Sequence, residues 1–188
     1  MKIFIVAVSA LVLSACSSNS LLDLRYTPQP YSVAGENTEA LKKFGVAHIN
    51  VGPFTKTAEF DNSCRVVSGI VEKPDSSGFE GYIQKALIAE LKQAGMYDDK
   101  TPKITLTGDV QLLSLSTWRM IYLSSWDIGV RLDSSNGKSV EINQHYDFNA
   151  GHMWLPDCQQ IADRYMFAVQ KTLGKLIDSP EFESLVTP

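Results

Sequence analysis

Cysteine is the residue type with the most reactive chemistry in this sequence, and its three copies stand in different contexts. Cys16 follows the small residues Ser14 and Ala15, directly behind an apolar run, whereas Cys64 and Cys158 lie far apart in the chain. A cysteine reacts as its thiolate, which is the nucleophile that can take up a lipid or form a disulfide. Which reaction each thiol undergoes depends on the compartment that the chain enters.

The first fifteen residues have the order of a secretory signal. Lys2 supplies a positive charge, the run from Ile3 to Leu13 is apolar apart from Ser9, and small residues follow. A charged start, an apolar run and a small-residue cleavage site define such a signal. The run is shorter than the ~20 apolar residues of a membrane-spanning helix. We therefore predict a signal peptide over residues 1–15; the alternative is a buried N-terminal core helix.

The residues Leu13-Ser14-Ala15-Cys16 resemble the lipobox of bacterial lipoproteins. This resemblance covers the N-terminal region and implies that the Cys16 thiol takes a diacylglycerol. It also implies cleavage just before Cys16 and acylation of the new amino terminus, for example with palmitate. Stable anchoring needs at least two acyl chains, at ~0.8 kcal/mol per buried methylene. Ser17, in place of an aspartate, implies transport to the outer membrane. The alternative is an ordinary secretory cleavage site with an unrelated cysteine.

Cys64 and Cys158 remain as an even pair once Cys16 is assigned to the lipid. The bacterial periplasm is oxidising, so two thiols in that compartment favour a disulfide. Closing this loop would constrain the unfolded chain by about 4–5 kcal/mol in the chain-entropy model. The alternative is a pair of buried thiols that never meet.

The length and net charge of the chain limit the functional classes of protein to which it could belong. Removing residues 1–15 from the 188 leaves 173 residues, about the length of one domain. Lys2 leaves with the signal, so 16 Lys and Arg face 21 Asp and Glu, a net charge of −5. Nucleic acid is bound by basic surfaces, so we predict no nucleic-acid partner.

His145, Asp147 and His152 are the best candidate metal ligands. On a strand, His145 and Asp147 share one face, and His152 could fold back from the next loop, as in a zinc site with an open position. The solvated face of an amphipathic strand is, however, where such side chains normally lie. We therefore predict no metal, no cofactor and no catalytic residue. A serine–histidine–carboxylate triad stays open, because its members need not be close in sequence.

Aromatic residues cluster in two predicted loops. Trp118, Arg119 and Tyr122 precede a strand, and Trp154 precedes a helix. Interface hot spots are enriched in Trp, Tyr and Arg, and loop aromatics could form a groove for acyl chains, peptide or glycan. We therefore predict that these four residues bind the partner. The alternative is that they close the ends of the core.

Hydrophobic periodicity predicts the elements that position these residues. We expect a tether over 16–42, a strand within 44–54, a short extended piece, a helix from a capping box at Ser77 and Glu80 to Gly95, three strands, and a helix capped by Asp157. The three strands are predicted from alternation over 104–112, 126–132 and 140–148, with Asn136-Gly137 as a hairpin turn and Leu112 on the buried face.

The expected fold is α+β: a mostly antiparallel sheet with two helices packed on one face, in the order β-α-β-β-β-α. The expected organisation is a signal peptide (1–15), a lipid-anchored tether (16–42) and a periplasmic α+β domain (43–188). This layout weakly resembles auxiliary lipoproteins of envelope transport and assembly systems.

From these features we expect a non-catalytic lipoprotein on the periplasmic face of the outer membrane, which binds an envelope protein or lipid. The alternative is a membrane-anchored periplasmic hydrolase or metal-dependent enzyme that acts on envelope material.

Overall fold

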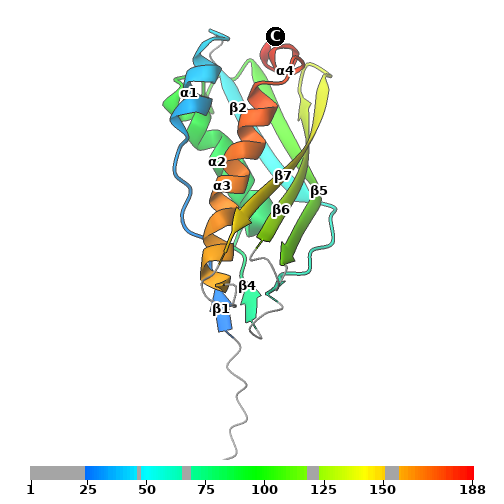
Figure 1. The fold of residues 1–188 in the computed structure, drawn as a ribbon. Coiled ribbons are helices and arrows are strands. Elements are labelled where there is room, and N and C mark those ends of the chain that lie inside the picture. Colours follow the sequence, from blue (N-terminus) through cyan, green and yellow to red (C-terminus); the bar gives the residue numbers. More distant parts are fainter. Residues whose placement is uncertain (1–23, 46–47, 65–68, 118–122, 151–156) are drawn as a thin grey trace, which may run out of the picture.

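A computed structural model describes residues 24–45, 48–64, 69–117, 123–150 and 157–188. These residues form an α+β fold, as predicted, and Figure 1 shows its arrangement. The elements in chain order are β1 (Leu24–Tyr26), α1 (Gly35–Lys42), β2 (Ile49–Lys56), β3 (Ser63–Cys64), β4 (Gly69–Val71), α2 (Gly78–Gln93), β5 (Ile104–Thr117), β6 (Leu123–Ser134), β7 (Ser139–Asn149), α3 (Cys158–Ile177) and α4 (Phe182–Val186). No helix among the described residues is long and apolar enough to cross a membrane.

The main sheet has the strand order β2-β5-β6-β7. β5, β6 and β7 pair antiparallel, but β2 pairs parallel with β5, so the sheet is mixed. A parallel pair needs a long crossover, which α2 supplies between these two strands. The predicted antiparallel pairing is therefore confirmed for β5, β6 and β7.

The turn between β6 and β7 forms where Asn136-Gly137 predicted it. The Gly137 N–H donates to the Ser134 carbonyl over 2.9 Å, and Gly137 has φ +86°. That left-handed conformation is open to glycine because it lacks a Cβ. The Asn136 side chain also donates to the Ser184 and Thr187 carbonyls at 2.8 Å each, which ties the turn to α4.

Leu112 is not in the core, contrary to the alternation predicted for β5. The register shifts between Val110 and Leu112, so that Gly129 lies opposite Leu112 and Ile128 lies opposite Leu113. Such a bulge inserts one residue and moves every following side chain to the other face. Leu112 is consequently 41% exposed, whereas Leu113 is 2% exposed. A Cβ on Gly129 would clash with Asn143 and Leu112, so a glycine fits this site.

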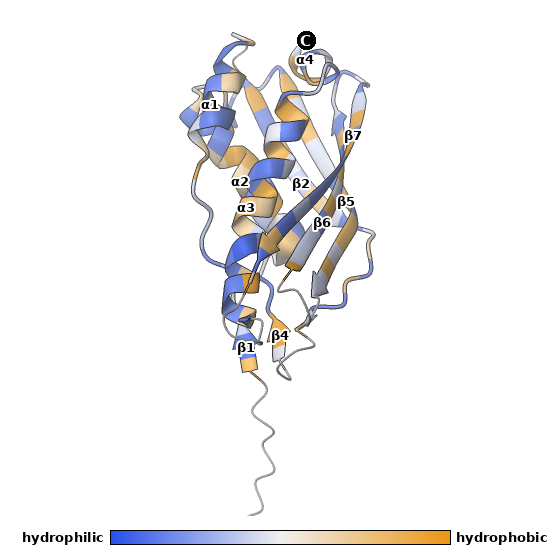
Figure 2. Ribbon diagram, in the orientation of Figure 1, coloured by the Kyte–Doolittle hydropathy of each residue, from blue (hydrophilic) through white to orange (hydrophobic). Residues whose placement is uncertain are grey.

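α2 and α3 cover one face of the main sheet, as expected (Figure 1). α2 packs against β2, and α3 packs against β6 and β7. The core between them is apolar, and its largest fully buried side chains include Trp126, Tyr165, Ile83, Leu87 and Ile161. Hydrophilic residues predominate on the outward side of α3 and along β7, as Figure 2 shows. Helix packing thus leaves the other face of the sheet to solvent.

The two long helices differ in how they begin. The Asp157 side chain accepts from the backbone N–H groups of Gln159 and Gln160, which is the cap predicted for α3. The capping box predicted for α2 is wrong, because Ser77 makes no side-chain cap bond and its hydroxyl donates to Asp75 instead. Gly95 ends α2 with φ +75°, and the Met96 N–H donates to the Leu91 carbonyl in the expected C-terminal motif.

Most of the segment predicted to be a tether is part of the domain. β1 pairs parallel with β4, β4 pairs antiparallel with β3, and these strands form a second sheet. α1 packs against α2 and α3. The described part of the predicted tether, residues 24–42, therefore packs on the domain.

A buried carboxylate holds this N-terminal segment in place. Glu90 on α2 is 0% exposed and accepts hydrogen bonds from four groups of the segment. The donors are the Tyr31 hydroxyl (2.6 Å), the Ala34 N–H (2.9 Å), the Thr38 hydroxyl (3.2 Å) and the Asn37 side-chain amide (3.5 Å). Burial, together with the Glu90 carboxylate, raises the pKa of Tyr31 well above its ordinary range. A buried charge needs such partners, so the positions of α1 and of the residues just before it depend on Glu90.

Candidate functional site

The residues predicted to bind the partner lie outside the described part of the chain. Trp118, Arg119 and Tyr122 belong to residues 118–122, and Trp154 to residues 151–156. Their role stays a prediction. The described elements that flank these two segments, namely the end of β5, the start of β6 and the start of α3, lie at the end of the molecule that carries β1 and β4 (Figure 1). We call this the β1 end.

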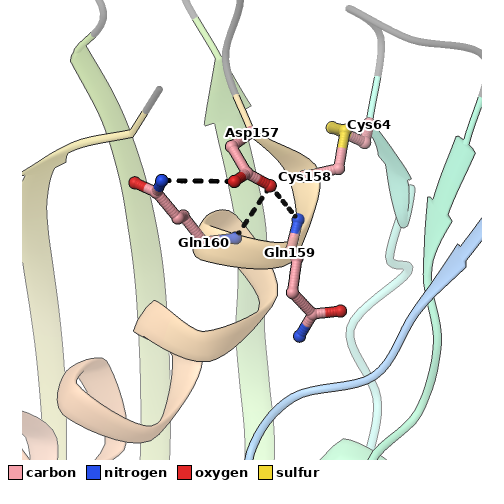
Figure 3. Close-up of a disulfide and its surroundings, with 5 residues drawn as sticks. All are labelled: Cys64, Asp157, Cys158, Gln159 and Gln160. Carbon is pink, nitrogen blue, oxygen red and sulfur yellow. Dashed lines mark hydrogen bonds between the residues drawn. A yellow bond between two sulfur atoms is a disulfide. The ribbon is translucent and has the colours of Figure 1, made fainter. Parts of the chain in front are cut away.

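The disulfide predicted between Cys64 and Cys158 is confirmed and lies at the β1 end (Figure 3). The two Cα atoms are 6.1 Å apart, and both residues are 1% exposed. The bond joins β3 to the first residue of α3, next to the Asp157 cap. It therefore ties the small sheet to the helical layer across 94 residues of sequence.

A cavity with a volume of about 430 Å³ also lies at the β1 end. It lies between β1, β4 and the start of α2, and it combines charged and aromatic side chains. The residues that line it are Arg25, Lys56, Phe60, Asn62, Ile70, Glu72, Lys73, Ser76, Ser77, Gly78, Phe79 and Glu80. Its composition suits a ligand that has both a charged and an apolar part.

Most of the acidic groups around this cavity already have partners. Arg25 contacts Glu72 at 2.7 Å. The Glu80 carboxylate folds back over the start of α2, where a Cβ on Gly78 would meet it at 2.6 Å. A carboxylate is stabilised there by the N–H groups and dipole of the first helical turn. Lys56 and Lys73 are exposed and have no hydrogen-bond or ion-pair partner among the described residues.

Asp75 organises the turn that leads into α2, beside the cavity. It accepts from the Ser77 N–H at 2.7 Å and pairs with Lys85 at 2.5 Å. The Lys85 bond, followed by the Ser77 bonds, lowers the pKa of Asp75 to about 2. The serine hydroxyl in this loop is thereby engaged in holding the turn.

An aromatic cluster forms the inner wall of the cavity. Phe60 and Phe79 meet edge to face at 4.9 Å, and Phe79 contacts Tyr165 at 5.1 Å. Trp126, which is 0% exposed, lies 5.0 Å from Tyr165 and donates from its ring nitrogen to the Ile161 carbonyl. No motif in the sequence marks Phe60, Lys56 or Lys73 as part of a site. The two lysines, at the end of β2 and just after β4, are exposed charges of a kind that is ordinary on a protein surface.

His145 and Asp147 do lie together on the solvated face of the main sheet, as predicted. His145 Nδ1 is 2.5 Å from Asp127, on the neighbouring strand, and Nε2 is 2.9 Å from Asp147. Carboxylates only accept, so both bonds require both ring nitrogens to be protonated. His152 lies outside the described residues. Within the described ranges, no group of three His, Cys, Asp or Glu side chains is arranged to hold a metal ion.

The Asp127 bond, with a further contribution from Asp147, raises the pKa of His145 above its ordinary 6.5. The imidazolium therefore stabilises the fold fully below pH 6.5, and this contribution is lost as the pH rises through the raised pKa. We predict that Asp127→Asn lowers the pKa of His145 more than Asp147→Asn does. Titration of the ring protons by NMR measures both. An unchanged pKa in Asp127→Asn would contradict the arrangement.

The outer edges of the main sheet are covered by side chains. On β7, Lys175 donates to the Asn143 carbonyl at 2.7 Å, and Gln144 donates to the His145 carbonyl at 2.5 Å. On β2, Gln84 donates to the Gly52 carbonyl at 2.8 Å, and Pro53 has no N–H to offer. Such features protect edge strands from pairing with another chain. Strand addition is thus disfavoured at both edges.

No family model matches this chain, and no curated protein matches it. A crystal structure of a Xanthomonas campestris protein, described under the family model DUF330, is similar over 81% of this chain and 91% of that one, with 10% sequence identity and a TM-score of 0.47.

Proposed function

We propose that this protein is a non-catalytic lipoprotein of the outer membrane, whose periplasmic domain binds an envelope protein or lipid. The observation that carries the proposal is the spacing between the lipobox-like cysteine and the domain. Cys16 and β1 are separated by residues 17–23 alone. Even a fully extended segment of this length spans at most about 25 Å.

This spacing would also determine which end of the domain faces the membrane. A lipid on Cys16 would hold β1 close to the membrane, and with it the cavity, the disulfide and the ends of β5, β6 and α3 (Figure 1). The hairpin turn at Asn136 and α4 lie at the opposite end. The disulfide supports an oxidising compartment, which fits the periplasm.

The polar side chains near the cavity bond to one another, and these contacts favour binding over catalysis as the role of the cavity. The Ser77 hydroxyl and Lys85 serve the Asp75 turn, and Arg25 pairs with Glu72. Acyl-transfer chemistry would need a nucleophile next to a base. Here these polar groups instead hold one another in place and shape the surface. The partner therefore meets the β1 end.

Acyl labelling tests the anchor. Cells that express the full chain should incorporate a labelled fatty acid into this protein, and Cys16→Ser should abolish the labelling because the thiol is the acceptor. The matched control is the double variant Cys64→Ser and Cys158→Ser, which removes the other two thiols and should still be labelled. Equal labelling of the wild type and Cys16→Ser would reject the proposed anchor.

A further inference from the structure

We propose that the cavity at the β1 end and its rim bind anionic phospholipid headgroups of the membrane that holds Cys16. The surface consists of Leu24, Arg25, Lys56, Ile70 and Lys73. This inference rests on the lipid anchor proposed above and deepens it, since it names the lipid surface itself as what the β1 end meets. Three features of the described residues carry it.

The first feature is where the chain enters the domain. Arg25 in β1 lines the cavity, and only residues 17–23 separate β1 from Cys16. Tethering makes the contact intramolecular, with an effective concentration of about millimolar for a short flexible linker. Insertion of Cys16 in the bilayer therefore strengthens a headgroup contact that the free domain already makes.

The second feature is that the unpaired charges at the cavity are positive. The mature chain is acidic overall, with 21 Asp and Glu, yet Lys56 and Lys73 face solvent at this cavity without a partner among the described residues. Glu72 is neutralised by Arg25, and Glu80 is held over the first turn of α2. Each cation near an anionic membrane surface contributes about a fivefold increase in partitioning. Charge complementarity thus favours phosphate-bearing headgroups.

The third feature is exposed apolar surface beside these cations. Leu24 is 39% exposed, and it pairs in register with Gly69, next to Ile70 of the cavity lining. Phe60 and Phe79 form the apolar wall behind the lysines. A surface that combines cations with apolar side chains matches the boundary between headgroups and acyl chains.

The experiment uses the unlipidated chain that begins at Ser17, which contains every described residue. It is incubated with vesicles of phosphatidylcholine alone, or of phosphatidylcholine with phosphatidylglycerol, and binding is measured by flotation. We expect binding to the vesicles that contain phosphatidylglycerol, and loss of binding at about 1 M salt, where the Debye length falls to about 3 Å. The double variant Lys56→Gln and Lys73→Gln should bind about 30-fold more weakly.

The control is Lys42→Gln with Lys138→Gln, which makes the same change in net charge at the opposite end, on α1 and at the β6–β7 turn. It should bind as the wild type does. Equal losses in both double variants would mean that net charge alone acts, and this would overturn the proposal. Binding to phosphatidylcholine alone, no binding at all, or displacement by inorganic phosphate would overturn it too. Because the chain carries no lipid here, these outcomes leave the acyl-labelling test of Cys16 unaffected.

Discussion

Replacing both Cys64 and Cys158 by alanine is expected to lower the free energy of unfolding by about 4–5 kcal/mol in the chain-entropy model. The reason is the length of the closed loop, because the two cysteines are 94 residues apart. Both sites are almost fully buried, so alanine leaves little polar imbalance behind. For a domain with a total stability of about 5–15 kcal/mol, this is a large fraction. Chemical denaturation of the chain from Ser17 measures the loss.

The wild type under reducing conditions is the control for this variant. It should lose about as much stability as the double alanine variant, because both remove the same covalent constraint. The loss should also release the small sheet, since the bond is what joins β3 to α3. Hydrogen exchange at Gly69–Val71 should therefore rise. Equal stability of the oxidised and reduced wild type would show that the bond contributes nothing.

Glu90→Ala is expected to destabilise the domain by about 3–5 kcal/mol. The substitution leaves the donors of Tyr31, Ala34 and Thr38 without their acceptor in a buried site, and the Asn37 amide keeps only its bond to the Gln170 carbonyl. Each buried donor that loses its partner costs about 1–3 kcal/mol, with partial relief by water. Since all four come from residues 31–38, the N-terminal segment should separate from α2 before the sheet unfolds.

Limited proteolysis separates this local effect from global unfolding. We expect cleavage within residues 27–42 of Glu90→Ala under conditions that leave the wild type intact. Tyr31→Phe is the matched control, because it removes one donor and keeps the carboxylate, at a cost of about 1 kcal/mol. If Glu90→Ala were as stable and as resistant as Tyr31→Phe, then the buried carboxylate would not be what holds the segment.

Detachment of this segment would also affect the orientation proposed for the domain. β1 continues directly into residues 27–34. Several side chains donate hydrogen bonds to backbone carbonyls of this segment and so hold it on the domain. Tyr82 donates to the Gln29 carbonyl at 2.9 Å, Gln159 to Thr27 at 3.0 Å and Gln170 to Ser32 at 2.6 Å. Without these contacts and Glu90, the chain between Cys16 and the packed part of the domain would lengthen by about 20 residues, and the proposed anchor would no longer hold the β1 end close to the membrane.

Local patterns in the sequence were sufficient to predict much of the sheet and both long helices. Asp157 capped α3, Gly95 ended α2, and Asn136-Gly137 made the hairpin, because each depends on conformational preferences of a few adjacent residues. The alternation from Trp126 to Leu132 correctly predicted the buried face of β6. The even pair of cysteines predicted the disulfide, since the third cysteine, Cys16, was assigned to the proposed lipid.

Long-range contacts decided the rest. Strand alternation carries no information about a bulge, so the exposed Leu112 depended on how β5 pairs with Gly129 of β6. α1 has polar, weakly periodic residues, and it exists because Glu90, far along the chain, accepts from Asn37 and Thr38. Tertiary partners of this kind override weak local propensity.

Residue patterns alone predicted that the main sheet has one buried and one solvated face, and Leu13-Ser14-Ala15-Cys16 is the basis of the lipid anchor that we propose. The surface at the β1 end, next to the proposed anchor, is a product of tertiary packing. The cavity at the β1 end is built from Arg25, Lys56, Phe60, Lys73 and the start of α2. These residues carry no shared motif, because what unites them is packing between segments that are distant in the chain rather than a preference that any one segment holds alone.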